Sequence, residues 1–314
     1  MPFNIIYGDI TTLKYDAIVN PTNQYLIAGG GIDKEIQTLA GNPLLIERIK
    51  IGTLSTGHAA ITNAYNMPCK KIIHVSSPEW INGLHGEDIL LASCYTEALR
   101  LAVENNINTI AFPLIASGIN GFPDKKAFSI AKVTIQNFLY NEPDINVSLV
   151  IYDKGDIDFD KMLQVDVAKY VKKHLLRNQN TSNKNVGKHT KVPISSSPSD
   201  TNVEKSFTDT LFDFLNKKQL ANVDCYKRAN IDRKLFSKIL GGNIPKKRTI
   251  LALCIALKLN LDETEKLLNT AGYTLSHSIK ADLIVEYFIV NNKFDIYELN
   301  EMLFDNGERM LGSI

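Results

Sequence analysis

The chain has 314 residues, of which 44% are hydrophobic, and a formal net charge of +1 at pH 7. This length predicts about two domains with hydrophobic cores, and the balanced charge argues against nucleic-acid binding over the whole surface. No apolar stretch approaches the roughly 20 residues of a membrane span. Four scattered cysteines without ligand spacing predict buried, reduced thiols, and neither a metal nor a cofactor is expected. A strand pattern at the start of the chain, without a leader pattern, predicts a cytoplasmic protein.

Strand patterns alternate with helix patterns over the first 176 residues. Apolar runs predict strands at 3–7, 16–20, 110–115 and 146–151, and helical spacing predicts helices at 88–105, 124–140 and 159–176. Strands that alternate with helices indicate an α/β domain with a mainly parallel sheet and helices on both faces. His74 lies in a further strand pattern, where we expect a packed structural histidine.

A polar turn and a run of three glycines follow the second predicted strand. Gly29, Gly30 and Gly31 are costly to order, so this loop is expected to approach a ligand closely. A helix that begins near Ile32 brings free N–H groups and a positive dipole end to the same place, which suits a phosphate. Asp33, in the first turn, either complements the dipole or takes part in chemistry, and the nearby asparagines favour the second role.

A second loop of the same kind follows the strand predicted at 110–115. Its apolar residues run almost unbroken, as in a strand buried on both faces. Gly118 and Gly121 then allow a turn with outward N–H groups, a common phosphate site at the carboxyl ends of strands in α/β folds. The alternative is a plain buried strand with a glycine-containing exit loop.

Six motifs in order give the first 176 residues a family resemblance. They are Gly8–Thr11, Asn20–Asn23, Gly29–Asp33, Thr56–Asn63, Ile73–His74, and Phe112–Pro113 followed by Ser117–Gly121. Together they resemble a macrodomain, most closely of the MacroD type. The resemblance implies a three-layer α/β/α module that binds ADP-ribose. Many members hydrolyse the bond between its distal ribose and a protein carboxylate, or remove an acetyl group from that ribose.

The resemblance also implies roles for individual residues. Asp9 would accept a hydrogen bond from the adenine amine, and Phe122 would flank the distal ribose. Asn23 would orient that ribose, and Asp33 would activate or position the attacking water, which makes these two the expected catalytic residues. The expected ligand-binding residues are Asp9, Ile10, Asn20, Gly29, Gly30, Gly31, Ile32, Ser117, Gly118, Ile119, Asn120, Gly121 and Phe122.

The chain departs from the MacroD pattern at three places. Ala28 replaces a fourth glycine, Pro21 and Thr22 replace two alanines, and Asn120 replaces an aromatic residue. Binding should survive these changes, whereas turnover depends on the water site that the aromatic residue shapes. Two hypotheses follow: a hydrolase of ADP-ribose linkages, or a reader of ADP-ribose without turnover.

The rest of the chain predicts a linker and a second domain. Residues 178–205 contain no aromatic residue and few aliphatic ones, which predicts a flexible linker. The expected domains are therefore 1–177 and 206–314, the second all-helical. Residues 246–273 carry most of a resemblance to the Cro-type helix-turn-helix, which makes 232–240 the recognition helix.

The charge of this second domain leaves two possible partners, nucleic acid and protein. Residues 225–258 hold nine Lys or Arg and one Asp, a balance that suits phosphate contacts. The residues expected to contact nucleic acid are Arg233, Lys234, Ser237 and Lys238. The alternative is a solvated helical face that recruits a protein, and either partner would direct the first domain to its target.

Overall fold

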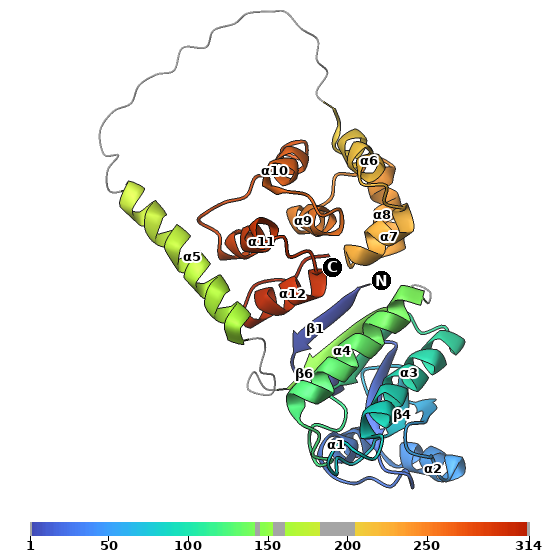
Figure 1. Cartoon of the computed structure of the whole chain (residues 1–314). Helices are drawn as coiled ribbons and strands as arrows, with labels where there is room; N and C mark the ends of the chain where they lie inside the picture. The colour runs from blue at the N-terminus through green and yellow to red at the C-terminus, as the bar shows by residue number, and fades with distance from the viewer. Residues whose placement is uncertain (1, 142–144, 153–160, 183–204, 313–314) are drawn as a thin grey trace, which may run out of the picture. The chain divides into compact units, whose positions relative to one another are not determined.

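The computed structural model describes residues 2–141, 145–152, 161–182 and 205–312. Packing divides the chain into two compact units, residues 1–158 and 159–314 (Figure 1).

A six-stranded mixed sheet forms the centre of the first unit. The strands lie in the order β1-β6-β5-β2-β4-β3, and every neighbouring pair is parallel except β3 with β4. The strands are β1 (Phe3–Tyr7), β2 (Ala17–Thr22), β3 (Ala59–Asn63), β4 (Lys71–Ser76), β5 (Thr109–Pro113) and β6 (Asn146–Ile151). This architecture confirms the predicted α/β fold.

Helices cover both faces of this sheet. Successive residues of a strand point to opposite faces, so neighbouring residues of β5 contribute to two different cores. Ala111 of β5 belongs to the core formed with Ile36 and Leu44 on one face. The next residue, Phe112, packs against Tyr95, with ring centroids 5.3 Å apart. The helices are the 3-10 helix η1 (Ile10–Thr12), α1 (Gly31–Ala40), α2 (Asn42–Ile51), α3 (Glu87–Glu104) and α4 (Asp124–Asn141).

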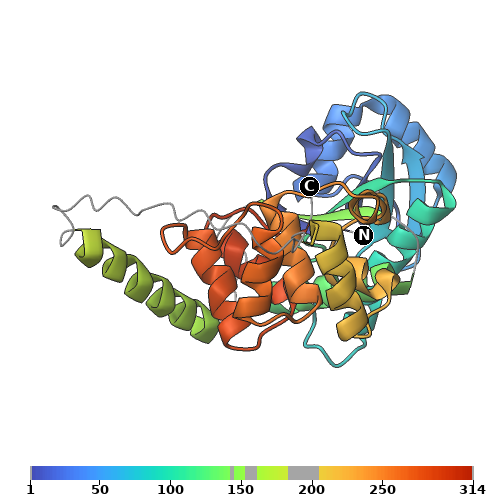
Figure 2. The same cartoon turned by 90° about the horizontal axis from the view of Figure 1, so that it is seen from above.

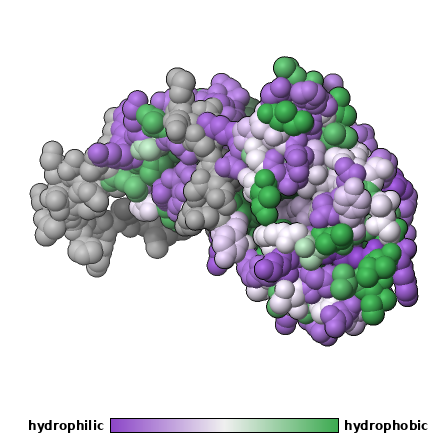
Figure 3. Space-filling model, turned by 90° about the horizontal axis from the view of Figure 1, so that it is seen from below, coloured by the Kyte–Doolittle hydropathy of each residue, from purple (hydrophilic) through white to green (hydrophobic). Residues whose placement is uncertain are grey.

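The sequence patterns did not predict α2 or β3. On α2, Leu45, Ile46 and Ile49 are exposed, so its apolar residues do not form a single stripe. β3 is a short edge strand with mostly half-buried residues, which gives no clear alternation. Figure 3 likewise shows apolar areas on the surface between polar ones.

The second unit is helical throughout its described part. Residues Thr249–Ala256 of α9 are all buried, and a helix that is apolar all round must be covered on every side. The orange and red helices gather into one cluster in both views (Figures 1 and 2). The helices are α5 (Lys161–Ser182), α6 (Phe207–Lys217), α7 (Asn222–Arg228), α8 (Arg233–Leu240), α9 (Lys247–Ala256), α10 (Leu261–Asn269), α11 (Lys280–Val290) and α12 (Ile296–Asp305).

Helix α5 differs from the sequence-based domain assignment. The sequence placed it in a first domain that ends at residue 177, but it packs on α11, where the Tyr170 hydroxyl donates to Glu286 Oε1 at 2.9 Å. Packing therefore divides the chain near residue 158. The linker predicted at 178–205 begins within α5, and its residues 183–204 lie outside the described residues.

The cysteines and helix lengths agree with two further expectations. Cys69, Cys94, Cys225 and Cys254 are all buried, and none forms a disulfide. Burial raises the pKa of the Cys94 thiol to about 12, so this group stays protonated at neutral pH. Among the helices of the described ranges, each is too short or too polar to cross a bilayer.

Candidate functional site

The candidate site lies where several parallel strands end. β1 leads into Gly8 and Asp9, β2 into the turn at Asn23, β5 into residues 114–123, and β6 into Tyr152. The carboxyl ends of neighbouring parallel strands meet at one edge of a sheet, which is where open α/β sheets bind ligands.

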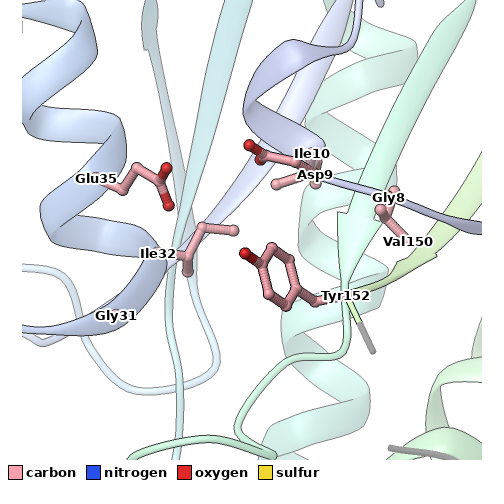
Figure 4. Close-up of a pocket in the computed structure, with 8 residues that line it drawn as sticks. All are labelled: Gly8, Asp9, Ile10, Gly31, Ile32, Glu35, Val150 and Tyr152. Atoms are coloured by element: carbon pink, nitrogen blue, oxygen red, sulfur yellow. The ribbon is translucent and has the colours of Figure 1, made fainter. Parts of the chain in front are cut away.

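One part of the site is a cavity of about 380 Å³, a volume within the range of small-molecule pockets. Ile32 and Tyr152 point toward one another across it, and Asp9 and Glu35 supply carboxylates (Figure 4). The lining residues are Gly8, Asp9, Ile10, Gly31, Ile32, Glu35, Val150 and Tyr152. Four residues expected at the site, Asp9, Ile10, Gly31 and Ile32, therefore lie together, while the sequence did not indicate Glu35 or Tyr152.

Asp9 has two different oxygens at this cavity. Its Oδ1 caps η1 by accepting from the Thr11 backbone N–H at 2.8 Å and from the Thr11 hydroxyl at 2.6 Å. Both of these bonds use the same oxygen, so a ligand donor can approach Oδ2. An Asp that caps a short helix has little freedom to turn, which fixes the direction of that oxygen.

Asp33 lies beneath the first glycine loop in a buried ion pair. Its side chain is 5% exposed, and the paired Arg48 side chain is fully buried. Arg48 Nη1 donates to Asp33 Oδ1 at 2.9 Å and Arg48 Nη2 donates to Oδ2 at 3.2 Å, a two-pronged contact. No sequence pattern indicated a role for Arg48, which stands among the apolar residues of α2.

The Asp33 carboxylate also holds the end of β2 and the glycine loop. Its Oδ1 accepts from Asn20 Nδ2 at 2.7 Å, and its Oδ2 accepts from the Thr22 hydroxyl at 3.2 Å. The Gly29 backbone N–H donates to Oδ2 at 3.1 Å. Both oxygens thus already accept several hydrogen bonds, and the carboxylate acts as a fixed anchor for this loop.

His74 extends the same network under the sheet edge. Asn20 Nδ2 lies 3.0 Å from His74 Nδ1, and the Thr62 hydroxyl lies 2.9 Å from His74 Nε2. Burial, together with the charge of Arg48, lowers the pKa of His74 to about 3, so the ring is neutral at physiological pH. This arrangement is that of a packed structural histidine, as predicted.

Asn23 shapes the turn after β2. Its Oδ1 accepts from the Tyr25 and Ile27 backbone N–H groups at 3.0 and 3.3 Å, and its Nδ2 donates to the Ile27 carbonyl at 2.7 Å. The residue itself is exposed, and its Nδ2 lies 3.8 Å from the place of a Cβ on Gly29. Asn23 therefore stands beside the glycine loop.

The two loops approach each other at Gly30 and Ile119. A Cβ on Gly30 would lie 2.7 Å from Ile119 Cδ1, so any larger residue there would displace the isoleucine. Gly30 is also the N-cap of α1 and offers no side chain to its first N–H groups. These N–H groups and the helix dipole favour an anion between the loops.

The second loop is fixed from below by Asn120 and Phe122. Asn120 Nδ2 donates to the Ser77 hydroxyl at 3.0 Å and to the Pro78 carbonyl at 2.9 Å. Phe122 is 2% exposed and packs on Trp80, with ring centroids 4.8 Å apart. Asn120, which replaces an aromatic residue of the MacroD pattern, thus ties this loop to the segment that carries Trp80.

The remaining loop residues complete the cradle. The Gly121 N–H donates to the Gly118 carbonyl at 3.0 Å, and the Ser117 hydroxyl donates to the Leu114 carbonyl at 3.0 Å. Gly121 has a φ of +71°, which favours glycine. The basic residues expected to contact nucleic acid lie in the other unit.

Comparison of the chain with known proteins shows the family of its first unit. Residues 19–131 match the model of the Macro domain. A Macro domain-containing protein of Chlorobaculum tepidum is 43% identical over 163 residues, which are 50% of this chain and 95% of that protein. The chain belongs to the macrodomain family.

Two relatives of the macrodomain have names that state an activity. Human ADP-ribose glycohydrolase MACROD2 is 43% identical over 169 residues, which cover 53% of this chain and 37% of that protein. An O-acetyl-ADP-ribose deacetylase of Escherichia fergusonii is 43% identical over 140 residues, which cover 43% of this chain and 79% of that protein. All three similarities cover no more than about half of the chain.

The buried ion pair of the macrodomain gives a stability prediction. Asp33→Asn and Arg48→Met should each lower the free energy of unfolding by about 3–5 kcal/mol, because each leaves one buried charge without its partner. The double variant should lose clearly less than the sum of the two. Urea unfolding followed by the fluorescence of Trp80, the single tryptophan, measures this unit.

Lys70→Met is the matched control, since Lys70 pairs with Asp16 at 2.7 Å but its side chain is 78% exposed. We expect a change of less than about 1 kcal/mol there. Additive effects of Asp33→Asn and Arg48→Met would contradict the coupling.

Proposed function

We propose that the macrodomain binds ADP-ribose and hydrolyses linkages to its distal ribose, and that the helical unit directs it to a target. The observation that carries this proposal is the uncapped start of α1 beside the cavity at the carboxyl edge of the sheet. The cavity takes the adenine, with Asp9 Oδ2 as acceptor for its amine. The diphosphate lies between the two glycine loops, and the distal ribose lies beside Asn23.

One relative is named an ADP-ribose glycohydrolase and the other an O-acetyl-ADP-ribose deacetylase. For this chain we propose two candidate substrates, an ADP-ribosylated protein carboxylate and O-acetyl-ADP-ribose. Both are esters at the distal ribose, so one site with one attacking water serves either. The alternative is a reader that binds ADP-ribose without turnover and acts through the helical unit.

Within this proposal, Asp33 works as a positioning residue. A general base needs an oxygen that can accept a proton from water, but both Asp33 oxygens already accept bonds from protein groups. The carboxylate instead sets the position of the Gly29 N–H and, with it, the anion site. Asn23 orients the ribose and the ligand's own diphosphate holds the water.

The role of Asp9 predicts which base the site prefers. Asp9→Asn keeps the cap on η1 through Oδ1 but turns the other position into a donor. We expect this variant to bind ADP-ribose more weakly by about 1–3 kcal/mol, because two donors then face each other. It should gain relative affinity for the inosine analogue, whose carbonyl replaces the amine.

Calorimetry of the full chain with both nucleotides measures this preference. The wild-type chain should prefer ADP-ribose and Asp9→Asn should lose that preference. Failure of the wild-type chain to bind ADP-ribose would overturn the proposed ligand.

Turnover separates positioning from base catalysis. The double variant Asp33→Asn with Arg48→Met keeps an acceptor for the loop and removes the unpaired charge. If Asp33 positions the loop, this variant should keep its rate within about tenfold of the wild-type chain. If Asp33 is a base, the rate should fall by at least about 10²-fold.

The assay uses a glutamate-linked ADP-ribosylated peptide and O-acetyl-ADP-ribose as separate substrates. Asn23→Ala should lose both affinity and rate, because the turn and the ribose contact fail together. Wild-type binding without hydrolysis of either substrate would establish the reader instead.

For the helical unit we propose that α7 and α8 form a helix-turn-helix whose second helix contacts DNA phosphates. Phe236 and Ile239 of α8 are buried, which turns the opposite face outward. The residues of that exposed face are Arg233, Lys234, Ser237 and Lys238. Residues 229–232 join the two helices, within the turn length of such motifs.

Salt dependence tests this contact. Binding of the full chain to duplex DNA should weaken with salt, with a slope of about −0.9 per phosphate neutralised. Reversal of Arg233, Lys234 and Lys238 to Glu should abolish binding, while reversal of the exposed Lys50, Lys125 and Lys172 should not. A flat salt titration, or equal effects of the two triple variants, would favour a protein partner.

A further inference from the structure

Two histidines and a glutamate converge where α5 packs on α11. His174 lies on α5, His277 precedes α11, and Glu286 lies on α11. Their possible ligand atoms all lie within 4.8 Å of one another. The imidazole rings of His174 and His277 meet edge to face, with centroids 5.6 Å apart.

Glu286 is the buried member of this group. Its side chain is 6% exposed, and the Tyr170 hydroxyl orients it by donating to Oε1 at 2.9 Å. Tyr170 in turn stacks on the His174 ring, with centroids 4.4 Å apart. The carboxylate and the first histidine are therefore held in place by one tyrosine.

The second oxygen of Glu286 has an unusual environment. Oε2 is buried and accepts no hydrogen bond within the described part of the chain, yet His277 Nε2 lies only 3.0 Å away. The two atoms are close enough for an ion pair when the His277 ring is protonated, but no well-aligned hydrogen bond joins them. Two ligands that both face a common third atom have this arrangement, because each directs its lone pair at the ion and not at its neighbour.

We propose that His174, His277 and Glu286 bind a divalent transition-metal ion, with Zn²⁺ as the expected occupant. Two imidazoles and one carboxylate, with a fourth position left for water, form a common zinc ligand set. Bonds of about 2.0–2.1 Å place tetrahedral ligand atoms roughly 3.3 Å apart, so the group must contract. His174 and His277 are not buried, so rotation of their side chains can supply this movement.

The ion would fasten α5 to the helical unit. α5 is the first helix of this unit, so the metal ion would hold the helix that follows the macrodomain in sequence against α11.

Metal titration of the full, chelator-treated chain tests the site. Calorimetry should show one Zn²⁺ per chain, and Co²⁺ in its place should give the visible absorption of a tetrahedral site. His174→Gln, His277→Gln and Glu286→Gln should each lose this binding. Tyr170→Phe should weaken it by about 10–100-fold, the usual effect of losing a group that orients a metal ligand.

His85→Gln is the matched control, because His85 also lies near a glutamate: its Nδ1 is 3.9 Å from a Glu87 oxygen. Among the described residues, no third metal-ligating side chain completes a group with these two. It should leave Zn²⁺ binding unchanged. Zn²⁺ should slow amide hydrogen exchange in α5 of the wild-type chain and of His85→Gln, but not of Glu286→Gln.

His174→Gln separates loss of metal binding from misfolding, because this half-buried residue of α5 lies outside the helical core and its replacement should leave that core intact. Its far-ultraviolet circular dichroism in chelator should match that of the wild-type chain. Absence of stoichiometric Zn²⁺ binding by the wild-type chain, or wild-type affinity in all three ligand variants, would overturn the proposal and leave an ordinary packing contact.

Discussion

The buried ion pair between Asp33 and Arg48 is the constraint on which the macrodomain site depends. It joins the first turn of α1 to α2, and the same carboxylate holds the end of β2 and the Gly29 N–H. A charge in this position is tolerated only because its partner is equally buried and both carboxylate oxygens are used. The glycine loop is therefore positioned by electrostatics from below and left free to face a ligand above.

The need to keep the loop open to a ligand also explains the glycine at the N-cap of α1. Gly30 lies against Ile119 of the opposite loop, and a side chain there would close the gap between the two loops. With no side chain at the N-cap of α1, the first N–H groups of the helix remain available to an anion. A preformed anion site needs both features: a glycine loop held in place by buried hydrogen bonds, and backbone N–H groups that remain open to the ligand.

The helical unit carries two groups of polar side chains of its own. α9 lies at its centre, and Arg233, Lys234 and Lys238 lie on the exposed face of α8. Glu286 of α11 lies with two histidines where α5 packs on α11. The basic face of α8 and this side-chain cluster are thus separate features of one unit.

The sequence by itself determined the fold class and predicted two glycine-containing loops at one edge of the sheet. Alternating strand and helix patterns, with the glycines at 29–31, 118 and 121, placed these two loops together because parallel strands end at the same edge of a sheet. It did not determine what Asp33 does, since its partner Arg48 lies 15 positions away on a helix whose apolar residues are partly exposed. The assignment of α5 and the meeting of His174, His277 and Glu286 likewise needed the tertiary structure. Periodicity reports which face of an element is buried, but which distant charges and ligands meet there is decided only when the elements pack.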